Sequence, residues 1–119
     1  MQKINVTSIL GTTTLLSAEK GLKLLKEILK TFKLGAKKIV VDFNNYNFIS
    51  STFINQSFGK LCIMKEWDLE EFKRKVEIVN LDDDDYEDII LSILNAEHRM
   101  KAMTKSLDTE EYFNTVYTY

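Results

Sequence analysis

Three hydroxyl side chains, Ser50, Ser51 and Thr52, stand in a row directly before a segment with a helical pattern. Free backbone N–H groups at the start of a helix attract anions. A hydroxyl at that place can accept a phosphoryl group, which adds about −1.5 to −2 charge at pH 7. Ser and Thr are also common N-cap residues. The local chemistry therefore favours helix capping, with a phosphorylation switch as the functional alternative.

Other reactive residue types offer no catalytic set. Asp82–Asp85 are consecutive, so their side chains splay apart, whereas Mg²⁺ and Ca²⁺ need converging oxygen ligands. We expect these aspartates to stabilise the start of a helix through its dipole. The single His98 has no identifiable nucleophile or orienting partner, and Cys62 lies on an apolar helix. We therefore expect a surface His98, a core Cys62, no catalytic residue, no metal, no cofactor and no enzymatic activity.

The charge of the chain is balanced overall but uneven along its length. Its 119 residues carry 16 Lys and Arg against 18 Asp and Glu, a formal net charge of −2. Residues 19–38 hold seven Lys against two Glu, whereas residues 82–88 hold six acidic groups and no basic ones. This pattern favours solvated faces, with an electrostatically steered protein contact as the alternative. We expect no nucleic-acid partner, no membrane span and a cytoplasmic location.

Hydrophobic periodicity predicts strands alternating with helices. Ser17 is the expected N-cap of the clearest helix and Gly35 its stop. The predicted elements are a strand in 3–10, a helix in 17–34, a strand buried on both faces in 38–43, a buried helix in 53–65, a short helix in 66–75, a strand in 76–80 and a last helix from Asp82. This order predicts an α/β fold, with a mixed, mostly parallel sheet of about four strands and helices packed on it.

The chain length favours a single domain, over residues 1–104. Residues 105–119 form an aromatic C-terminal tail with Tyr112, Phe113, Val116, Tyr117 and Tyr119. We expect this tail to add an edge strand or to dock a partner. A floppy terminus is the alternative.

Three short motifs resemble the bacterial STAS-like domain family of unknown function, a branch of the STAS fold found in anti-sigma factor antagonists. The motifs are Val41-Asp42-Phe43, then Phe48-Ile49-Ser50-Ser51-Thr52-Phe53, then Phe58-Gly59. The resemblance covers roughly residues 12–103. It implies a STAS-like fold and a non-enzymatic regulatory module. The partner that it implies is a histidine-kinase-like ATPase or an anti-sigma-type regulator.

In the antagonists, a Ser at the start of this helix is phosphorylated and the partner is then released. The register of the motif places Ser51 nearest that site, with Ser50 and Thr52 beside it. The antagonists have Asp where this chain has Ser50, and Gly where it has Phe53. The STAS-like family often has an acidic pair where this chain has Asn55-Gln56.

The interaction surface is expected where the buried strand, the turn and the next helix meet, because sites collect beyond the carboxyl ends of strands. The residues expected on it are Asp42, Asn44, Asn45, Asn47, Asn55 and Gln56. A small-ligand or nucleotide-binding sensor that uses the same crevice is the alternative function. A homodimer, in which the partner is a second copy of this chain, is a further alternative.

Overall fold

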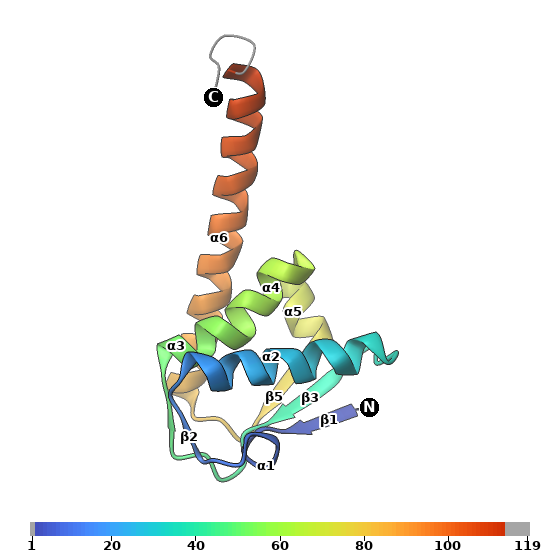
Figure 1. Cartoon of the computed structure of the whole chain (residues 1–119), viewed down its shortest axis with the longest axis vertical. Helices are drawn as coiled ribbons and strands as arrows, with labels where there is room; N and C mark the ends of the chain where they lie inside the picture. Colours follow the sequence, from blue (N-terminus) through green and yellow to red (C-terminus); the bar gives the residue numbers. More distant parts are fainter. Residues whose placement is uncertain (1, 114–119) are drawn as a thin grey trace.

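The computed structural model describes the backbone of residues 2–113 and the side chains of residues 2–102. Its strands are β1 (Gln2–Asn5), β2 (Thr14–Leu15), β3 (Ile39–Asp42), β4 (Phe48–Ile49) and β5 (Val76–Val79). Its helices are α1 (Val6–Leu10), α2 (Ala18–Lys33), α3 (Ser51–Ile54), the π-helix η1 (Asn55–Gly59), α4 (Lys60–Lys65), α5 (Leu69–Lys75) and α6 (Asp83–Phe113). Because α3, η1 and α4 follow one another without a break, we call them the central rod (Figure 1).

The sheet is parallel throughout the described residues. β1, β3 and β5 form one sheet in the order β1-β3-β5, with Val41 paired to Ile4 on one side and to Ile78 on the other. β2 and β4 form a separate short parallel pair. The predicted α/β architecture with helices packed on a mostly parallel sheet is therefore confirmed, as three strands plus a pair.

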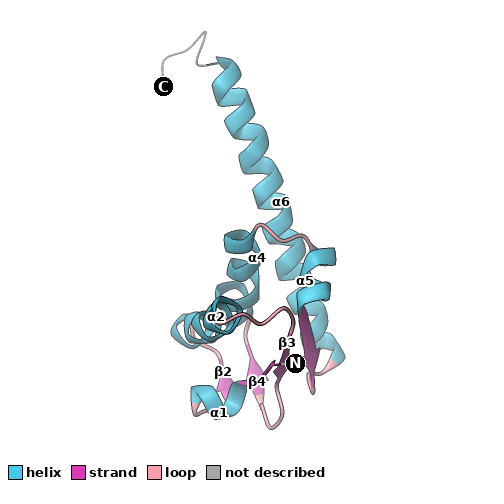
Figure 2. Cartoon of the chain, turned by 90° about the vertical axis from the view of Figure 1, so that its right-hand side faces the viewer, coloured by secondary structure: helices cyan, strands magenta, loops and turns pink. Residues whose placement is uncertain are grey.

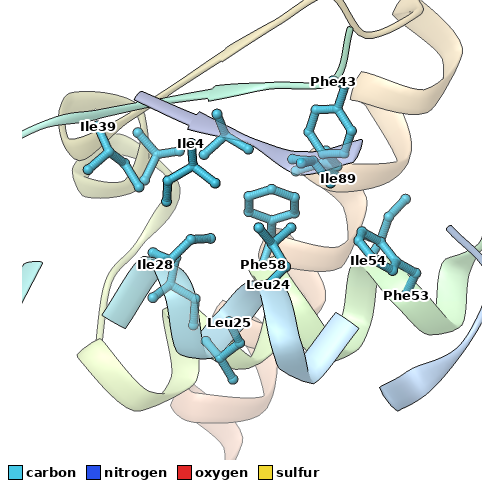
Figure 3. Packing of buried hydrophobic residues seen from close by; sticks show 14 of the residues in the cluster. Ile4, Leu24, Leu25, Ile28, Ile39, Phe43, Phe53, Ile54, Phe58 and Ile89 are labelled. Carbon is cyan, nitrogen blue, oxygen red and sulfur yellow. The ribbon is translucent and has the colours of Figure 1, made fainter. Parts of the chain in front are cut away.

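Helices cover one face of the three-stranded sheet. Ile39 and Val41 are fully buried, and Figure 3 shows Ile4 and Ile39 pointing toward Ile28 on α2. On the other face Lys3 and Glu77 are exposed and Val40 is half-buried. The prediction that residues 38–43 are buried on both faces was therefore wrong, because the helices lie on one side of the sheet only (Figure 2).

The helix α2 follows its sequence signals closely. The Ser17 hydroxyl accepts a hydrogen bond from the Lys20 N–H at 3.1 Å, which confirms the predicted N-cap. Gly35 adopts φ 109 just after the helix, which confirms the predicted stop. The fully buried positions on this helix are Gly21, Leu24, Leu25 and Ile28. This apolar face packs against β1 and the central rod.

The start of the chain differs from its prediction. Residues 3–10 were expected as one strand, but the strand ends at Asn5 and the chain turns into α1. Val6 and Leu10 are four residues apart and both buried, which is helical spacing. Gly11 then ends the helix with φ 67. The alternating pattern was therefore read correctly for β1 and wrongly for residues 6–10.

The last helix, α6, buries Ile89, Ile93 and Ala96 against the domain and then extends well past it (Figure 1). The backbone of residues 105–113, within the expected C-terminal tail, belongs to this helix. Val116, Tyr117 and Tyr119 lie outside the described residues. None of the described helices is long and apolar enough to cross a membrane.

We predict that Gly59→Ala destabilises the protein by about 1–3 kcal/mol, the usual cost of overpacking. An added Cβ would lie 2.6 Å from the Ser92 Oγ on α6. Gly→Ala at an unhindered helical position would instead stabilise the protein by about 0.5–1 kcal/mol. The sign of the change in the free energy of unfolding therefore shows whether position 59 is crowded. Urea unfolding should show a smaller cost for Gly59→Ala in a Ser92→Ala background. Equal costs in both backgrounds would contradict the contact.

Candidate functional site

The Asp42 carboxylate at the end of β3 contacts residues from or next to both neighbouring strands. Its Oδ1 accepts hydrogen bonds from the Asn80 Nδ2 at 2.8 Å and from the Asn44 N–H at 2.9 Å. Its Oδ2 lies 3.0 Å from the Lys3 Nζ on β1. The hydrogen bond from Asn80, with those from Asn44 and Lys3, lowers the pKa of Asp42 against the opposing effect of burial. The carboxylate is therefore an internal link between β1, β3 and the residue that follows β5.

Asp42 was predicted on the partner-binding surface, and this prediction was wrong. The residue is only 4% exposed, because its carboxylate is turned into the strand ends. Asn44 and Asn45 are exposed in the turn, and Asn45 has a left-handed φ of 71, which Asn tolerates. Asn47 is exposed as well, and its Nδ2 donates to the Thr13 hydroxyl at 3.0 Å.

Tyr46 is a structural residue of this turn that the sequence did not reveal. Its hydroxyl donates to the Asp85 Oδ2 at 2.6 Å and accepts from the Asp82 N–H at 3.0 Å. Burial, and then the neighbouring Asp85 carboxylate, raise the pKa of Tyr46 to about 12. The turn is therefore tethered to the start of α6, where the acidic run was expected to lie.

The three hydroxyls at the start of the central rod have different roles. The Ser50 Oγ accepts from the Phe53 N–H at 3.1 Å and donates to the Leu16 carbonyl at 2.7 Å. Ser50 is therefore the N-cap of α3, and its hydroxyl is engaged as both donor and acceptor. Ser51 and Thr52 are exposed, and neither hydroxyl has a hydrogen-bond partner within the described part of the chain.

Two large exposed apolar residues belong to the paired segments that lead into the free hydroxyls. Phe48 is 67% exposed and Leu16 is 49% exposed. The pairing of β2 with β4 places Phe48 opposite Thr14, and the hydrogen bond from Ser50 holds Leu16 beside the start of α3. We call Leu16, Phe48, Ser51 and Thr52 the Ser51 surface. Single exposed apolar residues are ordinary, but adjoining ones are typical of interaction sites.

Of the remaining predicted surface residues, Asn55 is exposed, and both Asn55 and Gln56 also contact neighbouring helices. The Asn55 Oδ1 accepts from the Ser92 hydroxyl at 2.6 Å, which links the rod to α6. Gln56 is half-buried, and its Cβ lies 3.0 Å from the position of a Cβ added to Gly21 on α2. Both residues therefore help to hold the rod between α2 and α6.

Two other residues considered in the sequence, Cys62 and His98, lie where they were expected. Cys62 is fully buried, and burial raises the pKa of its thiol to about 12, which confirms a core residue. His98 is exposed, as predicted.

An open cavity of about 330 Å³, lined by Gln2, Ala36, Lys37 and Lys38, lies where β1 and β3 begin. This cavity lies at the opposite end of the sheet from the crevice beyond the carboxyl ends of the strands. A small-ligand sensor was expected to bind its ligand in that crevice.

We predict that Asn80→Gly weakens the acid sensitivity of the protein. Gly tolerates the left-handed φ of 60 at this position. A carboxyl whose folded pKa is depressed contributes stability above its unfolded pKa of about 3.9 and loses it as pH falls through the folded value. The wild type should therefore lose free energy of unfolding as the pH falls from about 5 to below about 4.

Urea unfolding across that pH range should show a smaller loss for Asn80→Gly, which removes the largest cause of the low pKa. At pH 7 the variant should be about 1–3 kcal/mol less stable than the wild type. Asn95→Ala, at an exposed position on α6, is the control and should keep the wild-type profile. An unchanged pH profile for Asn80→Gly would contradict the assignment.

A comparison with protein families identifies the domain. A family model described as a STAS-like domain of unknown function matches residues 20–86, more than half of the chain. The matched range contains all of α2 except its first two residues, and it contains β3, the turn, the Ser51 hydroxyl, the central rod and β5. The chain matches no curated protein and no solved structure. The protein is therefore a member of the family of STAS-like domains of unknown function, as its motifs predicted.

Proposed function

We propose that this protein is a non-catalytic regulatory module of the cytoplasm, which binds a partner protein through the Ser51 surface and is switched by phosphorylation of Ser51. The division of roles among the three hydroxyls carries the proposal. Ser50 is occupied as the cap, whereas Ser51 is exposed and unbonded. A kinase can therefore reach the Ser51 hydroxyl without breaking a hydrogen bond of the fold.

The backbone around Ser51 supports a phosphoryl group at this position. Ser51 is the first residue of α3, and the first N–H groups of a helix have no partner within the helix. The Ser50 side chain accepts from the Phe53 N–H and leaves those of Ser51 and Thr52 available. Anions at such a position are stabilised by about 0.3–1 kcal/mol. Modification of Ser51 is thus compatible with the folded rod.

The apolar flanks explain how such a charge would change binding. Phe48 and Leu16 are suited to fill pockets on a partner, since buried aromatic and aliphatic anchors dominate interface energies. A phosphoryl group beside them would have to lose water when the interface forms, and this desolvation opposes binding. The expected direction is therefore release of the partner on phosphorylation.

The family resemblance suggests the class of partner, a histidine-kinase-like ATPase or an anti-sigma-type regulator. The competing ligand-sensor function draws less support from the geometry. The Asp42 carboxylate, the Asn44 N–H and the Asn80 Nδ2 at the strand ends bond to one another. They are therefore committed to the fold rather than turned toward a ligand.

We predict that a photo-crosslinking amino acid at Thr52 captures one discrete protein in the native cell. The same residue at Met64, which is exposed on α4, should capture none. In the Thr52-labelled chain, Ser51→Asp should weaken capture by about tenfold, equivalent to about 1.4 kcal/mol. Ser51→Ala should leave it unchanged. Equal capture from both positions, or no effect of Ser51→Asp in a chain with wild-type thermal unfolding, would contradict the proposal.

A further inference from the structure

The outer face of α2 presents a basic ridge that no acidic side chain of the described chain neutralises. Lys26 and Lys30 are exposed, lie four residues apart and form no ion pair within the described residues. Leu34, four residues further on, is 79% exposed. Residues at i and i+4 lie on the same face of a helix. We call Lys26, Lys30 and Leu34 the lysine ridge.

The first turns of α6 present the complementary pattern. Asp83 and Glu87 are exposed and form no ion pair within the described residues. Leu91, four residues after Glu87, is 57% exposed. We call Asp83, Glu87 and Leu91 the acidic ridge. Its order is two acidic residues and then a leucine, whereas that of the lysine ridge is two basic residues and then a leucine.

One molecule cannot bring these two ridges together. The central rod packs against α2 through Gly21 and Gln56, and against α6 through Asn55 and Ser92. Figures 1 and 2 show α2 and α6 separated by this rod. The outer faces of α2 and α6 therefore point away from each other, and contact between the ridges requires two molecules.

We propose that the protein associates with itself head to tail, with the lysine ridge of one copy on the acidic ridge of the next. When the two helices run in the same direction and Leu34 lies opposite Leu91, the common spacing of four places Lys30 opposite Glu87. It also places Lys26 opposite Asp83. Ridges of this i±4 spacing are the usual elements of helix packing.

The energetic roles of the two residue types differ. The opposite charges speed and align the encounter, and the leucines supply apolar area at one end of the contact. A pair of copies leaves the acidic ridge of one and the lysine ridge of the other free, so that the contact is heterologous and adds further copies rather than closing as a twofold dimer. A second copy is favoured over a nucleic acid because both complementary surfaces lie on this chain, and its net charge is −2.

Sedimentation velocity tests the proposal through a charge swap. The wild type should form concentration-dependent oligomers at about 0.01 M salt and dissociate at about 1 M, where the Debye length is about 3 Å. The variants Lys26→Glu/Lys30→Glu and Asp83→Lys/Glu87→Lys should each be monomeric, because each carries two ridges of like charge. An equimolar mixture of the two should associate again, since each supplies the ridge that the other needs.

Matched controls keep the outcome decisive. Lys37→Glu/Lys38→Glu makes the same charge change at exposed positions off the ridge and should associate like the wild type. The pair Lys30→Glu and Glu87→Lys repeats the swap and leaves the first residue of α6 unchanged. A wild type that is monomeric at low salt, single variants that still associate, or mixtures of folded variants that stay monomeric would each overturn the proposal.

Discussion

One carboxylate, that of Asp42, fixes the geometry on which the candidate site depends. It meets Lys3 on β1, the Asn44 N–H just after β3 and Asn80 just after β5. The three strands are only four residues long each, so few backbone hydrogen bonds define their common end. The hydrogen bonds and the ion pair of the buried Asp42 carboxylate hold the strands in place there. A buried carboxylate without such partners would lower the stability of the fold by several kcal/mol.

The Ser51 surface follows from this anchor through a series of local contacts. The turn leaves the strand at Asp42, is tethered to α6 by Tyr46, and enters β4 beside β2. Ser50 then bonds to Leu15 and Leu16 and caps α3. These contacts determine that the Ser50 hydroxyl is hydrogen-bonded and the Ser51 hydroxyl is exposed. The proposed switch therefore depends on the strand pairing as well as on the local helix cap.

Sequence reasoning succeeded where several local signals agreed and failed where the decisive partner was distant. The helix α2 has apolar periodicity, a Ser cap and a Gly stop, and all three predict the same element. Residues 6–10 fit both a strand and a helix, because five residues are too few to separate the two periods. The second hydrogen bond of Ser50 and the role of Tyr46 depend on Leu16 and Asp85, which are 34 and 39 residues away in the sequence. Such pairings carry no local pattern, so the hydroxyl row was predictable but not its division of roles.

Phosphorylation of Ser51 is the step on which the proposed switch depends. Peptide mass spectrometry of the chain purified from its native cells, under several growth conditions, tests it directly. We expect a phosphoryl group on Ser51 and an unmodified Ser50, because the Ser50 hydroxyl both donates and accepts a hydrogen bond. A phosphoryl group on Ser50, or unmodified peptides across residues 50–52 under every condition, would rule out Ser51 as the switch.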